Sequence, residues 1–442
     1  PLSPCDYHFL VIQRCLTRRD ASREVSFITL DLDGQPDPDR VRTAFRRVLA
    51  AHPATRGRIR YSLLLGRPHW RVEPDDSPLN HAYSHHDLRD ASDADARVHA
   101  RIERAINTPW GFRRPPLIRI DHFDLPGHRS HLCLQWPHGL MDAEGAHRFL
   151  REMARLDRAP DSPPPADLLD PCSAPDPLAG VSWLSRWRLF REGLREQSAL
   201  TKTSTAPLPT GTLNEQRPHR FLTRLGSLER SEQIRANAKR LTPPGAGLYV
   251  RYLAACTLRA LKRLYRNHGV DSENYMIAYP MRVSSVGAKR PLTGNYVVAP
   301  TLTATASQIE DRAALSEHIR RQVEAFRSRR ADIKQWAVLW MAGKMRPGMY
   351  HRVMQGPIGR VSILSGFAYY QADADPGWTA LAGAEITGFR MGGLVRFAPG
   401  WNVVFCRYRD RLTFNLSWVD GRHDESTAHE YADLIEAEVL QD

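Results

Sequence analysis

The chain has 442 residues, of which 42% are hydrophobic and 25% are charged, and its formal net charge is +13. This composition is typical of a globular protein of two or three domains and excludes a disordered or fibrous chain. No apolar run reaches the roughly 18 residues of a membrane-spanning helix. The opening Pro1–Pro4 resembles neither a signal peptide nor a transit peptide, and it lacks an initiator Met, as after trimming of the start. We therefore expect a cytoplasmic protein without a transmembrane segment.

The cysteine positions and the distribution of charge indicate which metals and binding partners the protein can have. The six cysteines lie at positions 5, 15, 133, 172, 256 and 406, with no Cys-x-x-Cys pair and no Cys/His cluster of zinc spacing, so we expect reduced, mostly buried thiols and no metal. Arg is spread along the whole chain, and no basic stripe with interleaved aromatic residues indicates a nucleic-acid binder. The charge fits phosphate-bearing or acidic partners such as coenzyme A, a phosphopantetheine arm or an acidic carrier protein, and it fits a solvated basic surface equally well.

In the first half, hydrophobic periodicity predicts strands over 26–33, 117–123 and 131–136, and helices from Asp37 to just before Pro53, over 94–107 and over about 143–156. A stretch rich in Pro, Asp and Ser at 158–178 has the composition of a linker. A helix rich in Trp and Leu follows at about 181–198, and a second polar stretch follows at 201–218. The domain break is expected in this region.

In the second half, the same patterns predict strands over 219–224, 274–284, 294–303, 360–364, 383–390, 401–408 and 411–418, and helices over 228–240, 246–267, 308–328, 332–340 and 424–440. The two halves have similar alternating content but show no sequence repeat. We expect an α/β (α+β) protein with subdomains at 1–175 and 219–442, a linker at 176–218, and the active site in the cleft between the two halves.

One histidine is placed for chemistry, because His138 directly follows a predicted strand and precedes a predicted helix. The strand fixes the depth of the imidazole, and the helix start anchors the backbone beyond it. Asp142 lies where an N-cap belongs, and Gly145 allows close approach of backbone or ligand. Histidine takes and returns protons near neutral pH. An acyl thioester is already reactive, so its transfer needs a base but no Ser or Cys nucleophile, and no GxSxG or papain-like context is present.

The spacing His-x-x-x-Asp is weak evidence alone, because the stretch from His85 to Asp90 also fits it and has a doubled His. That stretch precedes a polar helix and is predicted to be a surface turn. Residues 137–143 instead lie between a strand rich in Leu and Trp and an amphipathic helix. Taken without further context, the residues favour a buried structural imidazole at His138 over a catalytic base.

Nearly the whole chain resembles, in the right order, the condensation-domain superfamily. This superfamily includes chloramphenicol-acetyltransferase-like enzymes, nonribosomal-peptide condensation domains, plant-type BAHD acyltransferases and bacterial wax ester synthases. The matching stretches are Pro1–Pro4, Leu30–Gly34, Val48–Pro53, Arg56–Arg58, Asn107–Arg119, His138–Ala143, Ala278–Arg282, Gly294–Val298, Val403–Phe405 and the end of the hairpin at Trp418–Asp420. His138–Ala143 falls where the family's HHxxxDG motif belongs, whereas the stretch at 85–90 lies too early.

The resemblance implies two chloramphenicol-acetyltransferase-like αβ sandwich subdomains in a V shape with a tunnel between them. It makes His138 the catalytic base and Asp142 a structural residue that pairs with an Arg, for which Arg282 is the candidate; an ordinary surface Arg is the alternative. The candidate tunnel residues are Ala143, Gly145 and Asn295. No permanently bound cofactor is implied; the co-substrate is acyl-CoA or a phosphopantetheinyl thioester.

Two departures from the family pattern bear on activity. Pro137 stands in place of the first motif His, whose loss the family tolerates, and Ala143 stands in place of the motif Gly and adds a methyl group close to the tunnel. The BAHD signature DFGWG is absent from the second half, which disfavours that branch. The late hairpin most resembles the wax-ester-synthase and alcohol-acyltransferase branches.

Two Trp-rich stretches have alternative interpretations. Trp336–Met341 is interpreted as core, with a membrane-facing or acyl-chain surface as the alternative. Trp183, Trp187 and Phe190 are expected to pack between the domains.

Three functions are weighed. The leading one is an acyltransferase that moves an acyl group from acyl-CoA or an acyl or peptidyl carrier protein to a small alcohol or amine. The second is a non-catalytic docking or scaffold module of a biosynthetic assembly line, which the replacement of the first motif His by Pro137 suggests. The third is a wax ester or diacylglycerol synthase at a membrane surface.

Overall fold

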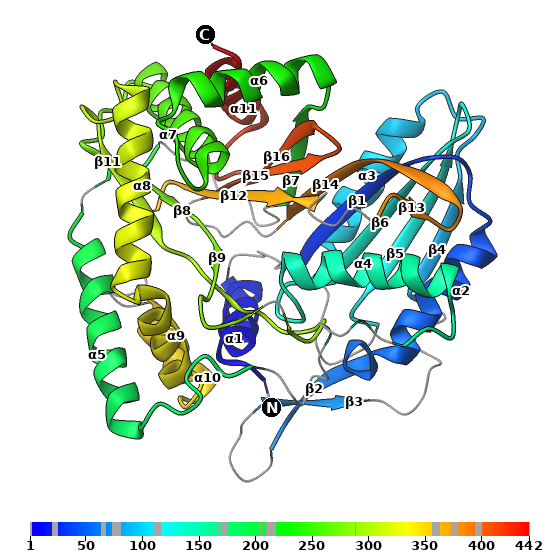
Figure 1. Ribbon diagram of the computed structural model, residues 1–442, viewed down its shortest axis with the longest axis horizontal. Coiled ribbons are helices and arrows are strands. Elements are labelled where there is room, and N and C mark those ends of the chain that lie inside the picture. The colour runs from blue at the N-terminus through cyan, green and yellow to red at the C-terminus, as the bar shows by residue number, and fades with distance from the viewer. Residues whose placement is uncertain are drawn as a thin grey trace.

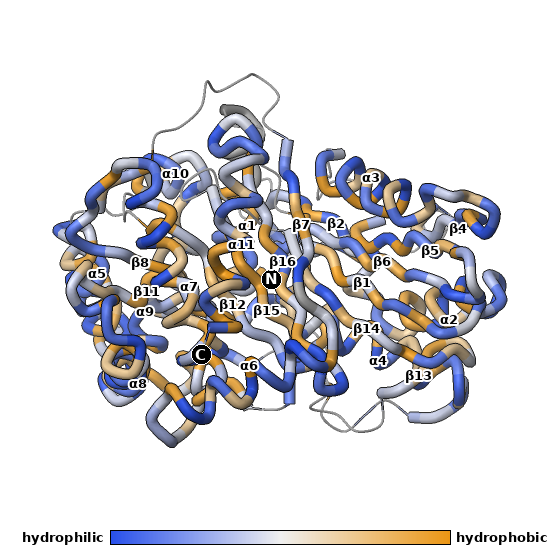
Figure 2. Tube along the Cα trace, turned by 90° about the horizontal axis from the view of Figure 1, so that it is seen from above, coloured by the Kyte–Doolittle hydropathy of each residue, from blue (hydrophilic) through white to orange (hydrophobic). Residues whose placement is uncertain are grey.

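The computed structural model describes residues 2–19, 25–62, 68–72, 81–108, 116–163, 165, 168, 175–203, 205–208, 218–287, 289–355, 363–372, 378–393 and 400–441. They form two lobes, each built on a six-stranded sheet with helices packed against it (Figure 1). Hydrophobic residues lie on strands and on helices of both lobes, and the outer helices alternate hydrophobic and hydrophilic residues (Figure 2). Parts of the predicted linkers at 158–178 and 201–218 lie outside the described residues.

The sheet of the first lobe has the order β13-β14-β1-β6-β5-β4. Its strands are β1 (Val25–Asp33), β4 (Tyr83–Asp87), β5 (Arg119–Leu125), β6 (Arg129–Pro137), β13 (Ala380–Leu381) and β14 (Ala384–Gly393). Strand β1 is buried on both faces: Ile28, Leu30 and Leu32 belong to the core cluster under α2 (Pro38–Ala51) and α4 (Ala143–Arg158), and Val25 and Phe27 belong to the cluster under α3 (Ala94–Asn107). Alternate residues of a strand point to opposite faces, which explains this division.

The sheet of the second lobe has the order β11-β8-β12-β15-β16-β7. Its strands are β7 (His219–Leu225), β8 (Asn274–Ala278), β11 (Thr301–Thr305), β12 (Ser365–Gln371), β15 (Trp401–Tyr408) and β16 (Arg411–Val419). The helices of this lobe are α6 (Leu228–Leu241), α7 (Leu248–Asn267), α8 (Arg312–Ser328) and α11 (Glu425–Leu440). One hydrophobic cluster joins these helices to the sheet, and α7 is buried along most of its length.

Several elements lie between or beneath the sheets (Figure 1). They are α1 (Pro4–Arg19), a 3-10 turn η1 (Pro53–Arg56), the hairpin of β2 (Gly57–Tyr61) and β3 (Pro68–Val72), α5 (Trp183–Leu200), the short pair β9 (Met281–Arg282) and β10 (Val297–Val298), α9 (Ala331–Ala342) and α10 (Pro347–Gln355). Helix α5 crosses α9 closely, since a Cβ at Gly193 would lie 2.7 Å from the carbonyl oxygen of Lys334.

The two sheets do not follow the predicted division of the chain throughout. Strand β14 comes from the second half, yet it pairs antiparallel with β1 in the first sheet, from Ser26 opposite Gly393 to Asp33 opposite Glu385. The first sheet therefore contains a strand from the predicted C-terminal subdomain at 219–442 as well as strands from the predicted N-terminal subdomain at 1–175.

Most predicted elements are found within a few residues of their expected bounds, including α2, α3, α4, α7 and the late strands β14 to β16. The surface turn predicted at 85–91 is wrong in its first part, because His85 and His86 belong to strand β4, which pairs in parallel with β5. The strand predicted at 360–364 falls partly outside the described residues, and the observed strand β12 begins at Ser365.

The predicted burial is found for one Trp-rich stretch and only in part for the other. Trp336 is buried in a cluster with Tyr296, as expected for core. The packing expected of Trp183 and Trp187 is wrong, because these side chains on α5 are 63% and 40% exposed, whereas Phe190 packs partly against the same cluster as Trp336.

The cysteines whose side chains the structure describes, Cys5, Cys133, Cys256 and Cys406, are buried thiols, as predicted. Among the described residues, no helix combines the length and apolarity needed to cross a bilayer.

Candidate active site

The stretch that carries His138 is a tight connection between β6 and α4. The strand ends at Pro137, and the amide of Leu140 donates to the carbonyl oxygen of Pro137 to close a turn. The indole Nε1 of Trp136 donates to the carbonyl oxygen of Met141 at 2.9 Å and ties the far side of the turn to the sheet. His138 lies at the tip of this turn and is half-buried as a residue, and its Nδ1 is enclosed.

Asp142 lies in a buried network of hydrogen bonds. Its Oδ1 accepts from the amide of Gly145 at 3.0 Å, which makes it the N-cap of α4. The same oxygen accepts from Nη2 of Arg290 at 2.8 Å, and Oδ2 accepts from the amide of Tyr296 at 3.1 Å. The carboxylate is 2% exposed and therefore serves the backbone and an ion pair rather than a substrate.

The predicted partner Arg282 is wrong, and Arg290 takes its place. Arg282 is exposed on the short strand β9, whereas the Arg290 side chain is 1% exposed and reaches Asp142. Burial opposes the charge of the guanidinium, but the Asp142 carboxylate outweighs it and raises the pKa of Arg290 above its ordinary value. Arg290 lies in a loop, where no strand or helix periodicity indicates the direction of its side chain, so sequence reasoning chose the Arg at a predicted strand instead.

Asn295 supports the backbone of His138. Its Nδ2 donates to the carbonyl oxygen of His138 at 2.9 Å and to Oδ1 of Asp6 at 2.8 Å, and its amide donates to the same Oδ1. Asn295 is fully buried, so it lies behind the turn rather than on an open surface. Burial raises the pKa of Asp6 to about 6, although the bonds from Asn295 and Ser3 oppose that shift.

A second contact from α1 orients the imidazole. The ring of Phe9 stacks on His138 with centroids 4.1 Å apart and an interplanar angle of 29°. Phe9 is itself 5% exposed, so it offers the imidazole a rigid apolar wall. Sequence reasoning predicted no helix at 4–19 and missed both Phe9 and Asp6. Their only signal was the resemblance of Pro1–Pro4 to the family's opening.

The loop from the second half runs directly against the turn. The amide of Gly294 donates to the carbonyl oxygen of Leu140 at 2.7 Å, and Met141 and Gly294 form an isolated bridge. The close approach predicted at Gly145 is made by backbone, since a Cβ there would lie 2.4 Å from the carbonyl oxygen of Leu292. Ala143, the other candidate tunnel residue, is half-buried against the core under α4, and its place in a tunnel stays a prediction.

A further network joins α4 to the second sheet. The hydroxyl of Tyr370 on β12 lies 2.7 Å from Nδ1 of His147 and donates to Oε2 of Glu144 at 2.9 Å. Burial lowers the pKa of His147 to about 4, so this ring is neutral near pH 7. The network spans the two lobes and was not predicted.

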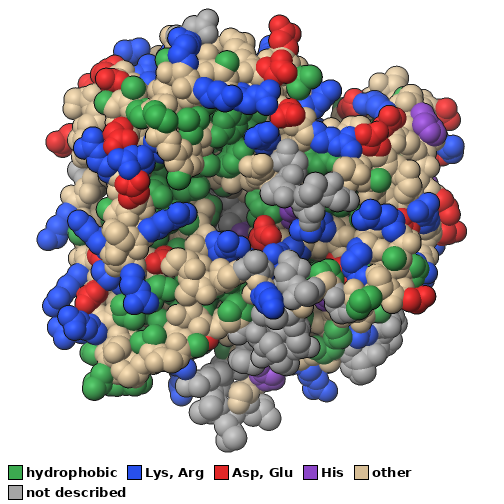
Figure 3. Space-filling model, viewed as in Figure 1, with side chains coloured by type: hydrophobic (Ala, Val, Ile, Leu, Met, Phe, Trp, Pro, Cys, Tyr) green, Lys and Arg blue, Asp and Glu red, His purple; other side chains and the backbone are tan. Residues whose placement is uncertain are grey.

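The arrangement brings a half-buried imidazole to the junction of the two lobes and fixes its backbone from the second half. Figure 3 shows that the face drawn in Figure 1 is hollowed near its centre, between the lobes. A histidine held in this way can exchange a proton with a reactant that reaches the junction.

Comparisons with known proteins give the fold. No family model matches the sequence, and no curated protein matches it. The first condensation domain of the CDA synthetase superposes with a TM-score of 0.70 at 17% identity over 100% of this chain and 96% of that chain. The condensation domain of the monacolin K polyketide synthase MokA gives a TM-score of 0.65 at 12% identity, over 100% and 96%.

A third structure is a variant of the starter condensation domain of the rhizomide synthetase RzmA in complex with C8-CoA. It superposes with a TM-score of 0.65 at 14% identity, over 99% of this chain and 93% of that chain. These similarities extend over both lobes and confirm the fold expected from the sequence. The chain has the two-lobed condensation-domain fold.

Proposed function

We propose that the protein is an acyltransferase that moves an acyl group from a thioester to a hydroxyl or amine, with His138 as the general base. The observation that carries this proposal is the half-buried imidazole at the junction of the lobes, with its backbone bound by Asn295 and its ring stacked on Phe9. Packing and hydrogen bonds of this kind fix a group in the way that a catalytic residue requires.

The chemistry follows from the thioester. As the acceptor oxygen or nitrogen attacks the carbonyl carbon, its proton passes to Nε2 of His138 and a tetrahedral oxyanion forms. When the oxyanion collapses, the carbon–sulfur bond breaks, and the imidazolium returns the proton to the departing thiolate. The products are an ester or amide and a free thiol, and His138 is restored.

The donor is proposed to be acyl-CoA or an acyl group on a carrier protein. The fold is shared with a starter condensation domain that was solved in complex with C8-CoA. The net charge of +13 suits the phosphates of coenzyme A and the acidic surface of a carrier protein alike.

Thiol release measures this activity directly. The purified chain is incubated with acyl-CoAs of increasing chain length, or with loaded carrier proteins, and with candidate alcohols and amines. His138→Ala is expected to lower turnover by about 10²–10⁴-fold with the fold intact. His86→Ala is the matched control. His86 lies on the edge strand β4 of the first sheet and pairs with Asp121 of β5, so its replacement is expected to change turnover little. Equal turnover in the His138 variant would overturn the assignment.

The non-catalytic alternative has a different signature. A docking module would bind a carrier protein and release no thiol from any donor, with or without His138. That result would contradict the proposed activity.

A second candidate function, a wax ester or diacylglycerol synthase at a membrane surface, is favoured by the exposed face of α5. Trp183 and Leu184 are 63% and 74% exposed, and the rings of Trp183 and Trp187 stack with centroids 6.2 Å apart. Arg188 and Arg191 are exposed on the same helix. Trp and Leu beside Arg are the residues with which amphipathic helices bind anionic lipid surfaces.

Co-sedimentation with vesicles tests this candidate. The protein is expected to bind vesicles that contain phosphatidylglycerol better than vesicles of phosphatidylcholine alone. The double change Trp183→Ser and Leu184→Ser should abolish that binding. Leu228→Ser removes an exposed Leu from α6 and should not. Equal binding of all three proteins would remove the observation that favours a membrane surface.

A further inference from the structure

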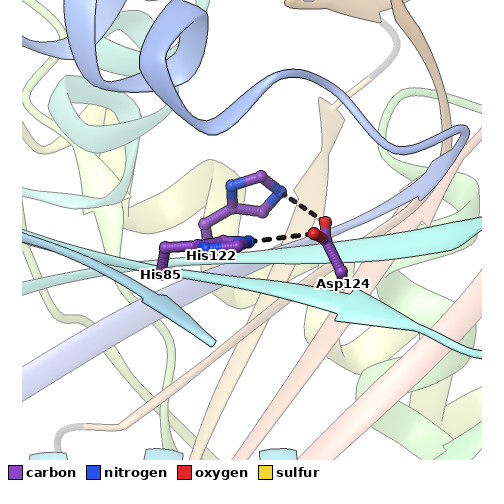
Figure 4. Close-up of side chains that lie close together, drawn as sticks. All are labelled: His85, His122 and Asp124. Atoms are coloured by element: carbon purple, nitrogen blue, oxygen red, sulfur yellow. Dashed lines mark hydrogen bonds and ion pairs between the residues drawn. The ribbon is translucent and has the colours of Figure 1, made fainter. Parts of the chain in front are cut away.

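Three potential metal ligands converge on one face of the first sheet, away from the turn that carries His138. His85 on the edge strand β4 lies directly opposite His122 on β5, and Asp124 follows two residues later on β5, so all three side chains project from the same face. Figure 4 shows both imidazoles directed at the Asp124 carboxylate. Nε2 of His85 lies 2.9 Å from Oδ2, and Nε2 of His122 lies 3.3 Å from Oδ1.

Two buried polar atoms of this cluster lack a hydrogen bond. The His122 side chain is completely buried, and Asp124 is 7% exposed. Among the described residues, neither Nε2 of His122 nor Oδ1 of Asp124 makes a hydrogen bond, although the two atoms face each other. Buried polar atoms are rarely left in this state, because each costs about 1–3 kcal/mol unless a partner or an ion satisfies it.

Tyr83 makes His122 suitable as a metal ligand. Its hydroxyl lies 2.9 Å from Nδ1 of His122. When Nδ1 donates its proton to the Tyr83 oxygen, the lone pair of Nε2 points at Oδ1, and two acceptors oppose each other. A cation between them satisfies both. An outer hydrogen bond of this kind also fixes the tautomer and the orientation of histidines that bind metals.

We propose that His85, His122 and Asp124 bind one divalent transition-metal ion, with Zn²⁺ as the best match. The three ligand atoms lie within 4.8 Å of one another. Zn²⁺ at about 2.0–2.2 Å from nitrogen and oxygen ligands needs them about 3.3 Å apart, so a small closure suffices. The His85 side chain is 28% exposed, which leaves a fourth position for water.

This proposal departs from the expectation of no metal, and the reason is topological. Zinc spacing in a sequence indicates ligands that lie close along the chain, whereas these ligands come from two strands separated by α3 and are brought together by the parallel pairing of β4 and β5. The metal would join the edge strand β4 to the neighbouring strand β5.

Metal binding is measured on the full chain without reference to acyl transfer, so its failure is separable from failure of the proposed function. After removal of metal with a chelator, ZnCl₂ is titrated against the protein in competition with a chromophoric chelator, and bound zinc is counted by mass spectrometry. CoCl₂ serves as a spectroscopic probe, because tetrahedral Co²⁺ absorbs strongly in the visible range. One ion per chain is expected.

Two neighbouring histidines provide the matched comparison. His85→Ala removes a half-exposed ligand and should weaken Zn²⁺ binding at least about 100-fold and abolish the Co²⁺ spectrum. His86→Ala removes the adjacent His, which faces Asp121 on the other side of the sheet, and should leave both unchanged. If His85→Ala does not fold by circular dichroism, Asp124→Asn replaces it.

Two results would overturn the proposal. One is the absence of saturable Zn²⁺ binding by the wild-type chain. The other is equal binding by the His85→Ala and His86→Ala variants, which would place any bound zinc elsewhere.

Discussion

Replacing Arg290 by Met removes the cation that pairs with Asp142 but keeps much of the side-chain volume. The two groups are 2.8 Å apart, and their side chains are 1% and 2% exposed. Breaking a buried ion pair by removing one partner costs about 3–5 kcal/mol, because the remaining charge is left uncompensated. Asp142 keeps the amides of Gly145 and Tyr296 as donors, so we expect the lower end of this range, about 3 kcal/mol.

Replacing Asp142 tests whether the loss of stability comes from the ion pair between Arg290 and Asp142. Asp142→Asn keeps an oxygen that can cap α4 but leaves Arg290 as an unpaired buried cation, so a loss of about 3–5 kcal/mol is expected. In the double variant neither charge remains. Its loss should be smaller than the sum of the two single losses by about 3 kcal/mol, which is the coupling energy of a double-mutant cycle.

Urea unfolding provides the measurement. Tryptophan fluorescence and far-UV circular dichroism are followed together, since coincident transitions justify a two-state free energy. Arg282→Met is the control, because Arg282 is exposed on β9 and its replacement should change the free energy of unfolding by no more than about 0.5 kcal/mol. A coupling energy within about 0.5 kcal/mol of zero, or equal losses in the Arg290 and Arg282 variants, would refute the pairing and the link between the two lobes that it implies.

Three further changes probe the surroundings of the turn by the same unfolding measurement. Gly145→Ala should lower the free energy of unfolding by about 1–3 kcal/mol, because its Cβ meets the carbonyl oxygen of Leu292, whereas Gly348→Ala, which meets nothing within 4 Å, should leave it unchanged or raise it by up to about 1 kcal/mol. Tyr370→Phe removes the hydroxyl that joins α4 to β12 and should cost about 1–3 kcal/mol; no loss would mean that the hydroxyl is not needed there. Burial raises the pKa of Asp6 from 3.8 to about 6, so the stability that its protonated form contributes is complete below pH 4 and is lost as the pH rises to 6. Asp6→Asn should remove this decline of roughly 3 kcal/mol, and parallel pH profiles of the variant and the wild type would contradict it.

The parts of the fold that follow hydrophobic periodicity were predictable from the sequence. The helix predicted after Asp37 is present with Asp37 as its N-cap, and Asp142 caps α4 as its position before an amphipathic run predicts. Strand β4 was not predictable in this way. Its sequence Tyr-Ser-His-His-Asp is polar, and its place is fixed by pairing with β5 at the edge of the sheet, a tertiary contact that overrides local preference.

The candidate site was likewise only partly predictable from the sequence. The place of His138 between a strand and a helix could be predicted, because both elements leave a periodic signature on either side of it. Its proposed role came from the resemblance of nearly the whole chain to a known superfamily and not from this periodicity. Phe9 and Arg290 were not found, because they are distant in sequence and reach the turn from a helix and a loop of other parts of the chain. Asn295 was expected to line a tunnel, and its bond to the His138 backbone was not foreseen. No spacing rule on a single sequence relates positions that only the tertiary fold brings together.

These contacts make the position of the imidazole a property of both lobes. The turn belongs to the first sheet through β6, but its outer side is bound by Gly294 and Asn295 from the second half, and β14 carries a further strand of the second half into the first sheet. A shift of one lobe against the other must therefore either break buried hydrogen bonds at Asp142 and Asn295 or carry the turn along. Because both sets of bonds are buried and one of them includes an ion pair, carrying the turn along costs less. Substitutions in the loop that contains residues 290–296 should consequently alter the proposed catalysis without touching a substrate, by moving the His138 imidazole relative to the hollow between the lobes.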